Sequence, residues 1–310
     1  MSALHLRHLL PLLATLALAA CFGGTKPAPP APIPTVTPSV APVPLKIGLA
    51  LGGGAAKGFA HIGVIKMLEA SGIHVDVVAG TSAGSVVGAL YASGMNPFQL
   101  QETAFALDEA RIRDVRLFSG GLVQGRKLQD YVNQLVHQQP IERLQLPFAA
   151  VATELATGAR TVFVRGNTGQ AVRASSSIPG VFEPVAISGK HYIDGGVVSP
   201  IPVDAARQLG ADFVIAVDIS AQPSGTTPSG LANIVGQSIT IMGRQLAAQE
   251  TARADVVIRP STAGIGPLDF ARKDQAILQG EKATLAAMPL IRQRLEAMRV
   301  ARQMAHAPGG

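Results

Sequence analysis

The stretch from Val75 to Leu90, VDVVAGTSAGSVVGAL, limits the possible folds more than any other part of the sequence. It joins an apolar run of strand type to an apolar run of helix type through the small residues Gly-Thr-Ser-Ala-Gly. Gly80 and Gly84 leave room for a strained turn and for close packing of the helix. This setting is typical of a nucleophile elbow with Ser82 at its centre, although a serine is also a good helix N-cap.

Strand-type runs alternate with helix-type runs over the folded part of the chain. Such alternation predicts an α/β fold around a mostly parallel sheet. The strand runs are 45–54, 74–80, 146–155, 159–166, 185–196, 211–220 and 254–260, and the helix runs are 58–72, 82–94, 203–210, 229–252 and 272–305. Residues 97–137 are expected to be helical, with an interruption at the glycine-rich SGGLVQG.

The N-terminal 44 residues have a different composition from the rest. Residues 1–20 have a short basic region, an apolar stretch and then small residues, which is the layout of a secretory signal. Leu18-Ala19-Ala20-Cys21 resembles the bacterial lipobox, so Cys21 is expected to carry lipid. An ordinary signal peptide with a chance cysteine is the alternative. Residues 21–44 are rich in Pro and Ala and predict an extended tether.

These features predict a lipid-anchored bacterial membrane lipoprotein. Phe22 after the cysteine favours the outer membrane, facing the periplasm or the cell surface. After the tether, residues 45–210 are expected to form the catalytic domain. Residues 211–310 are expected to complete it with a strand and helices.

Charge and cysteine content limit the possible partners. The chain has 26 Lys and Arg against 20 Asp and Glu, a net charge of +6. This excess fits attraction to an anionic lipid surface, and an ordinary basic surface gives the same value. No dense Lys/Arg tract with interleaved aromatic residues occurs, which argues against nucleic acid. The scattered Asp and His residues show no ligand spacing, so neither a metal nor a cofactor is expected.

The glycine run Gly52-Gly53-Gly54 follows one strand and precedes a helix. A Walker loop is excluded because Gly58 and Phe59 follow Lys57. A dinucleotide fingerprint is disfavoured because Lys57 stands where its third glycine belongs. Consecutive glycines at a helix start can instead direct N–H groups at an oxyanion. A tight strand-to-helix turn without a ligand is the alternative.

A serine nucleophile needs a base. The histidines after Ser82 are His137, His191 and His306, and none is placed where a Ser-Asp-His order requires it. Asp194 ends an apolar strand, and Gly195 and Gly196 after it permit a sharp turn. A carboxylate held beside the serine hydroxyl can act directly as the base. The alternative is a plain Asp-Gly turn.

Taken together, these pieces resemble the patatin-like phospholipase family. The resemblance rests on the glycine loop from Gly52 to Gly58, the elbow from Gly80 to Gly84, and Asp194-Gly195-Gly196. The stretch ASSSIPGVFEPV, residues 174–185, also resembles a segment of the family. The likeness covers about residues 45–210, continues weakly to about 290, and suggests closeness to bacterial members of the neuropathy-target-esterase type.

The resemblance implies a three-layer α/β fold with a mostly parallel central sheet flanked by helices. It implies a Ser82–Asp194 dyad that cleaves phospholipid or lysophospholipid esters through an acyl-enzyme. Oxyanion and substrate contacts would come from the loop and elbow residues Gly52, Gly53, Gly54, Ala55, Lys57, Gly58 and Ala83. Lys57 would fix the loop or attract anionic head groups.

Two other functions remain open on the sequence: an esterase or thioesterase for a soluble acyl substrate, and a non-catalytic lipoprotein that binds acyl chains or a partner. The apolar residues Phe98, Phe105, Leu107, Ile112, Leu117 and Phe118 are candidates for an apolar cap, and ordinary core packing also explains them.

Overall fold

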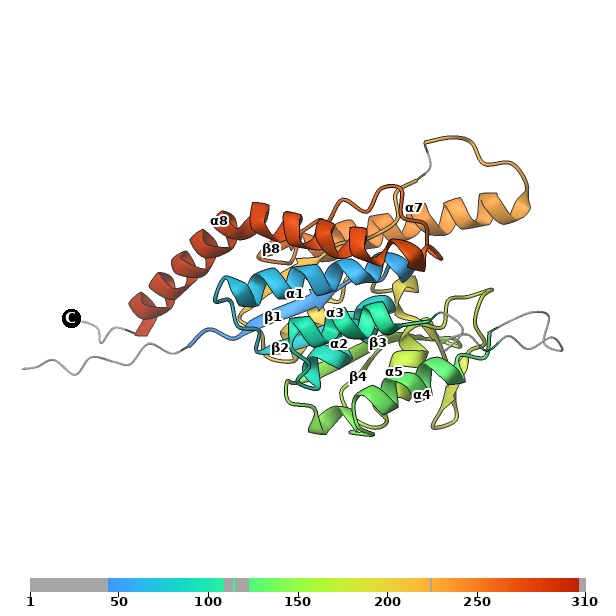
Figure 1. Cartoon of the computed structure of the whole chain (residues 1–310), viewed down its shortest axis with the longest axis horizontal. Helices are drawn as coiled ribbons and strands as arrows, with labels where there is room; N and C mark the ends of the chain where they lie inside the picture. The colour runs from blue at the N-terminus through green and yellow to red at the C-terminus, as the bar shows by residue number, and fades with distance from the viewer. Residues whose placement is uncertain (1–43, 109–113, 115–122, 224, 307–310) are drawn as a thin grey trace, which may run out of the picture. The chain divides into compact units, whose positions relative to one another are not determined.

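In the residues that a computed structural model describes (44–108, 114, 123–223 and 225–306), eight strands form one sheet (Figure 1). The strand order is β5-β6-β3-β2-β1-β7-β8, and β4 pairs with β3 outside this path. The strands are β1 (Ile47–Leu51), β2 (Val77–Thr81), β3 (Phe148–Glu154), β4 (Arg160–Phe163), β5 (Val185–Ile187), β6 (Lys190–Asp194), β7 (Phe213–Val217) and β8 (Val256–Ile258).

The sheet has a parallel part and an antiparallel part. Strands β3, β2, β1, β7 and β8 run parallel, and every residue of β1, β2, β3 and β7 is buried. Burial on both faces is what a sheet covered by crossover helices requires. Strands β4 and β6 pair antiparallel to β3, and β5 pairs antiparallel to β6. The expected α/β fold with a central sheet between helices is confirmed, with antiparallel strands beyond β3.

Helices cover both faces because strand side chains alternate between the two faces. On one face, Leu49 and Leu51 of β1 belong to the larger core cluster, with residues of α1 (Ala60–Ala70), α2 (Ala83–Ala92) and α8 (Lys273–His306). On the other face, Ala50 packs with α6 (Val203–Gln208) and with Ala247 of α7 (Leu231–Thr251). The glycine loop and the elbow follow β1 and β2 and therefore lie between these layers.

Further helices follow α2 in the chain. α3 (Pro97–Ala106) and α4 (Arg126–Leu135) occupy the region expected to be a broken helix. α5 (Thr168–Ser175) was not predicted; its N-cap, Asn167, accepts a hydrogen bond from the N–H of Gln170. Residues 1–43 lie outside the described residues, and with them the predicted signal peptide, Cys21 and nearly all of the tether.

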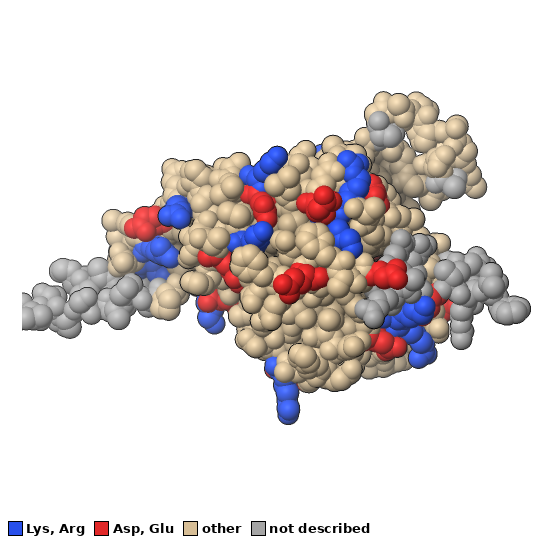
Figure 2. All heavy atoms as spheres, in the orientation of Figure 1, with Lys and Arg blue, Asp and Glu red and all other residues tan. Residues whose placement is uncertain are grey.

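The N-terminal half of α7 extends past the end of the sheet (Figure 1). Its exposed apolar side chains include Leu231, Ile239 and Met242, and residues 231–243 contain no charged residue (Figure 2). Only the C-terminal end is anchored, where Ala247, Glu250 and Thr251 are buried. No helix in the described ranges combines the length and the apolar character needed to cross a bilayer.

Candidate active site

Ser82 occupies the sharp turn between β2 and α2. Its backbone has φ 54° and ψ −124°, and residues other than glycine rarely adopt such a positive φ. The backbone segments of the turn also lie so close together that they require glycine. A Cβ on Gly80 would lie 2.4 Å from the carbonyl oxygen of Gly84. A Cβ on Gly84 would lie 2.1 Å from the carbonyl oxygen of Leu51. The structure therefore has the strained strand-to-helix turn that the sequence predicts.

The side chains of Ser82 and Asp194 are in direct contact. The Ser82 hydroxyl donates a hydrogen bond to Asp194 Oδ2 at 2.6 Å, and each residue is only 6% exposed. The other carboxylate oxygen, Oδ1, accepts the N–H of Gly196 at 2.7 Å. Thr153 Oγ1 donates to the carbonyl oxygen of Asp194, and the Asp194 N–H donates to Ser177. The carboxylate is thus held at a fixed position beside the hydroxyl.

Strand register explains why residues so far apart in the sequence meet. Thr81 is paired with Val151 of β3, and Asp194 is paired with the next β3 residue, Ala152. Ser82 and Asp194 therefore lie at the same level of the sheet, on either side of β3. Asp194 ends its strand, as expected, but β6 runs antiparallel to β3 and therefore in the direction opposite to β2. The two residues meet because β3 extends beyond β2 and pairs with β6 there.

The environment of Asp194 changes its affinity for protons. Burial raises its pKa from 3.8 to about 6, and the hydrogen bonds from Ser82 and Gly196 oppose the rise. Both ionisation states are therefore accessible near neutral pH. A carboxylate with this pKa can take a proton from a hydroxyl and return it to a leaving group.

The glycine loop contacts the elbow directly. Gly53 packs against Ser82, and a Cβ on Gly53 would lie 3.2 Å from the Ser82 Cβ. Gly58 lies in the 3₁₀ helix η1 (Ala55–Phe59) and packs against Ala83 of the elbow. A Cβ on Gly58 would lie 2.6 Å from the Ala83 Cβ, so only glycine fits there. Gly195 likewise fits against the Val151 carbonyl oxygen in the turn after Asp194.

Two of the expected oxyanion donors are already occupied. The Gly52 N–H donates to Val217 O at 3.1 Å and the Gly53 N–H to Pro200 O at 3.0 Å. The Gly53 N–H, one of the donors expected around Gly53, Gly54 and Ala55, is therefore engaged by a neighbouring segment, and so is the Gly52 N–H. Within the described chain, the N–H groups of Gly54, Ala55 and Ala83 make no such bonds. Ala55 has a φ of 50°, a left-handed value that is strained for a residue other than glycine.

Lys57 does not line the cavity beside Ser82. It is half-buried, and this burial lowers its pKa while the nearby charge of Asp218 opposes the change. Its expected contact with anionic head groups stays a prediction.

His61 was missed because the search for a base considered only histidines after Ser82. It is fully buried on α1, and its Nε2 lies 2.8 Å from the carbonyl oxygen of Gly52. Burial lowers its pKa to about 4, so the ring is neutral and Nε2–H donates to that oxygen. His61 thus fixes the start of the glycine loop. His137 and His191 are exposed, and neither bonds to Ser82 in the described structure.

Glu250 was also missed, since nothing near it in the sequence indicates a site. Its two carboxylate oxygens accept the Ser199 hydroxyl at 2.5 Å and the Ile201 N–H at 2.7 Å. The carbonyl oxygens of Ser199 and Pro200 in turn accept Thr81 Oγ1 and the Gly53 N–H. Burial raises the pKa of Glu250 to about 7, against the effect of the two donors. Through residues 199–201, Glu250 supports both the elbow strand and the glycine loop.

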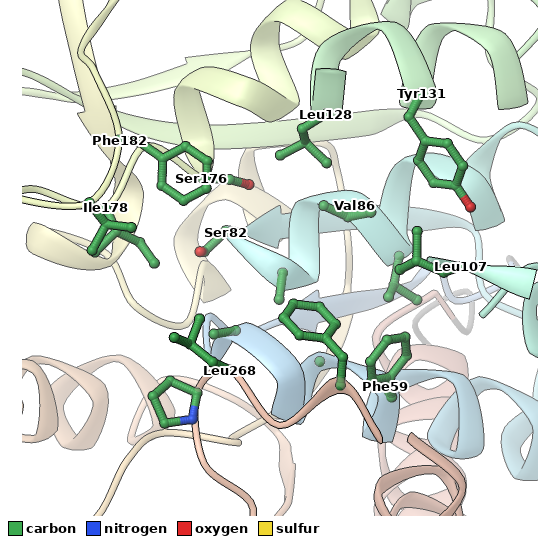
Figure 3. A pocket seen from close by; sticks show the side chains of 17 residues that line it. Phe59, Ser82, Val86, Leu107, Leu128, Tyr131, Ser176, Ile178, Phe182 and Leu268 are labelled. Carbon is green, nitrogen blue, oxygen red and sulfur yellow. The ribbon is translucent and has the colours of Figure 1, made fainter. Parts of the chain in front are cut away.

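A cavity of about 430 Å³ opens beside Ser82 (Figure 3). Its walls are almost entirely apolar, which suits a hydrocarbon chain. They include Phe59, Val86, Leu107, Leu128, Ile178, Phe182 and Leu268.

Of the three proposed apolar cap residues that the structure describes, one lines this cavity. Leu107 does so, while Phe98 and Phe105 are exposed. Ile112, Leu117 and Phe118 lie outside the described residues. No group of three or more His, Cys, Asp or Glu side chains in the described ranges is arranged to hold a metal ion.

Comparison with known proteins points to one family. Residues 49–207 match the family model described as patatin-like phospholipase. The chain is 34% identical over 206 residues to the NTE family protein Rv1063c of Mycobacterium tuberculosis, covering 66% of this chain and 57% of that protein. It is 31% identical over 278 residues to lysophospholipase NTE1 of Pyricularia oryzae, covering 79% of this chain and 18% of that protein. The match thus spans little more than half the length of the mycobacterial relative.

Among solved structures, VipD from Legionella pneumophila has a similar fold. The TM-score is 0.56 at 15% sequence identity, over 81% of this chain and 67% of VipD.

Proposed function

The chain belongs to the patatin-like phospholipase family, and we propose that it is a serine acyl hydrolase that cleaves phospholipid or lysophospholipid esters. The observation that carries the proposal is the 2.6 Å hydrogen bond to the buried Asp194 carboxylate from Ser82, which itself lines an apolar cavity. The cavity would hold an acyl chain with its ester group at Ser82. The Pyricularia relative is a lysophospholipase by name, which supports the same substrate class.

The proposed reaction has two acyl-transfer steps. As Ser82 Oγ forms a bond to the ester carbonyl carbon, its proton passes to Asp194 Oδ2. The tetrahedral intermediate then breaks the ester bond, and the leaving alcohol oxygen takes the proton from Asp194. In the second step Asp194 accepts a proton from water, which attacks the acyl-enzyme, and Ser82 recovers its proton as the fatty acid leaves.

The developing oxyanion requires hydrogen-bond donors. The Ser82 N–H donates to Ser175 Oγ and is therefore not available. The N–H groups of Gly54, Ala55 and Ala83 are the backbone candidates, because they are not engaged elsewhere and Ala55 and Ala83 line the cavity with Ser82. Ala83 also begins α2, where the helix dipole favours negative charge.

A fluorophosphonate probe tests the proposal directly, because it phosphonylates only an activated serine. We expect wild-type protein to be labelled at Ser82, as identified by peptide mass spectrometry. Labelling should disappear in Ser82→Ala and persist in Ser93→Ala, a control at the other end of α2 whose hydroxyl donates to Leu90 O.

The substrate class is tested with purified wild-type protein and a panel of diacyl phospholipids, lysophospholipids and short soluble esters. Release of fatty acid from the lipids supports the proposal, whereas hydrolysis of the soluble esters alone would replace it with a soluble-ester function. A folded wild-type protein that neither reacts with the probe nor hydrolyses any ester would overturn the proposed function.

A further inference from the structure

Three consecutive serines, Ser175, Ser176 and Ser177, lead out of α5 and form hydrogen bonds with both the elbow and Asp194. The outer two have structural roles. Ser175 Oγ accepts the Ser82 N–H at 2.9 Å and donates to Val151 O at 2.5 Å. It therefore ties the nucleophile turn to β3.

Ser177 fixes the other end of the run. Its hydroxyl donates to Arg173 O at 2.9 Å, and its carbonyl oxygen accepts the Asp194 N–H at 2.9 Å. The backbone of the serine run is thereby held at both members of the Ser82–Asp194 pair. This leaves little freedom for the residue between them.

Ser176 differs from both neighbours. It is only 8% exposed, yet its hydroxyl has no hydrogen-bond partner in the described structure. Leaving a buried hydroxyl without a partner costs about 1–3 kcal/mol. Alanine at this position would avoid this cost.

The position of Ser176 suggests what satisfies the hydroxyl. Ser176 and Ser82 line the same cavity (Figure 3). The wall around them is apolar. A bound acyl ester presents its oxygen atoms only at the reacting end, next to Ser82, since the rest of the chain is hydrocarbon. Those oxygens are acceptors and require a donor.

We propose that the Ser176 hydroxyl donates a hydrogen bond to an oxygen of the reacting ester group of the substrate. The proposal rests on the proposed acyl hydrolase function and adds a side-chain donor to the backbone N–H groups of Gly54, Ala55 and Ala83. Ser176 is then a catalytic residue that touches substrate, and Ser175 and Ser177 are positioning residues.

Kinetics and thermal stability of Ser176→Ala and Ser175→Ala, measured beside wild type, test the assignment. For Ser176→Ala we expect kcat/KM on a lysophospholipid and on a short ester of the same acyl group to fall about tenfold or more. The rate of fluorophosphonate labelling should fall as well, because the probe's phosphoryl oxygen occupies the place of the ester oxygen. The Tm should stay unchanged or rise, since the substitution removes an unpaired buried hydroxyl.

Ser175→Ala is the matched control. It removes two buried hydrogen bonds and should lower the Tm, whatever its effect on turnover. A Ser176→Ala protein with wild-type kcat/KM and labelling rate would overturn the proposal, and so would one whose Tm falls as far as that of Ser175→Ala. Wild-type protein without esterase activity or labelling would instead reject the proposed function, so the two failures are distinguishable.

Discussion

Ser82 combines a strained backbone with a side chain that makes one strong hydrogen bond. Its positive φ is tolerated because the surrounding chain holds the turn from several sides. Ser175 Oγ receives its N–H, and the Ser85 and Val86 N–H groups of α2 donate to its carbonyl oxygen. This arrangement leaves the Oγ alone to face Asp194 and the cavity.

The pKa of Asp194 predicts how the activity depends on pH. Asp194 must be ionised to accept the Ser82 proton, and its pKa is raised to about 6. We therefore expect kcat/KM to rise with pH through an apparent pKa of about 6 and then to reach a plateau. A pH–rate profile on a soluble ester measures this value, because kcat/KM reports the free enzyme. A profile that is flat between about pH 5 and 8 would contradict the role of Asp194 as the base.

Asp194→Asn is the matching variant. It retains an oxygen that can accept a hydrogen bond but cannot take a proton, so turnover should fall by about 10²–10⁴-fold.

The stability of Asp194→Asn, in contrast, should not fall at neutral pH. Because the folded-state pKa of Asp194 lies above its ordinary value of 3.8, its contribution to stability is lost as pH rises through about 6. The Tm of Asp194→Asn at pH 8 should therefore equal or exceed that of wild type.

At the scale of elements, the site is assembled where short segments cross. The turn after β2, the loop after β1 and the turn after β6 meet because β3 pairs with both β2 and β6. Residues 199–201 lie against these segments and receive hydrogen bonds from Thr81 and Gly53. The geometry of the site therefore depends on residues 199–201, which Glu250 of α7 holds by hydrogen bonds.

We expect Glu250→Ala to weaken both the fold and the activity. The substitution leaves the Ser199 hydroxyl and the Ile201 N–H without their acceptor, at a cost of about 1–3 kcal/mol for each buried donor. Thermal unfolding and kcat/KM measure the two effects. We expect kcat to fall more than KM rises, because the substitution would displace the glycine loop with its proposed oxyanion donors.

Glu250→Gln and Gln249→Ala are the controls for this prediction. Glutamine offers an oxygen to the Ile201 N–H and should restore most of the stability. Gln249 is exposed on the same turn of α7, so its truncation should change neither quantity. If Glu250→Ala matches wild type in both Tm and kcat, Glu250 does not support the site.

At the scale of the whole molecule, the expected lipid on Cys21 would determine the location of the catalytic domain in the cell. Cys21 is the only cysteine of the chain and lies in the lipobox-like run, ahead of a Pro-rich segment. A lipidated Cys21 would place an enzyme with an apolar acyl cavity at its substrate. The segment of about 20 residues behind it would allow reach, at about 3.1 Å per residue if fully extended as polyproline II.

We expect full-length protein expressed in a bacterium to fractionate with membranes and Cys21→Ala to lose this association. Mass spectrometry of the N-terminal peptide should show the acyl mass on Cys21 in wild type only. Ser82→Ala is the control, since it removes the proposed nucleophile and should remain in the membrane fraction. Continued membrane association of Cys21→Ala would refute the lipid anchor.

The sequence by itself determined the fold class and the main elements of the site. An apolar run, small residues and a second apolar run specify a strand, a tight turn and a helix through steric effects within a few residues. Ser82, the glycine loop and the Asp-Gly-Gly turn were therefore recognisable, and the contact between Ser82 and Asp194 was expected before the structure showed it.

Only the tertiary structure decided which groups are engaged and which are free. The Gly53 N–H is occupied by Pro200, Glu250 supports residues 199–201, and Ser176 is left without a partner while its two neighbours are bonded. Each of these facts depends on pairing between segments far apart in the chain, as does the antiparallel direction of β6. Local periodicity carries no information about such partners, because they are set by strand register and by the packing of the helix layers.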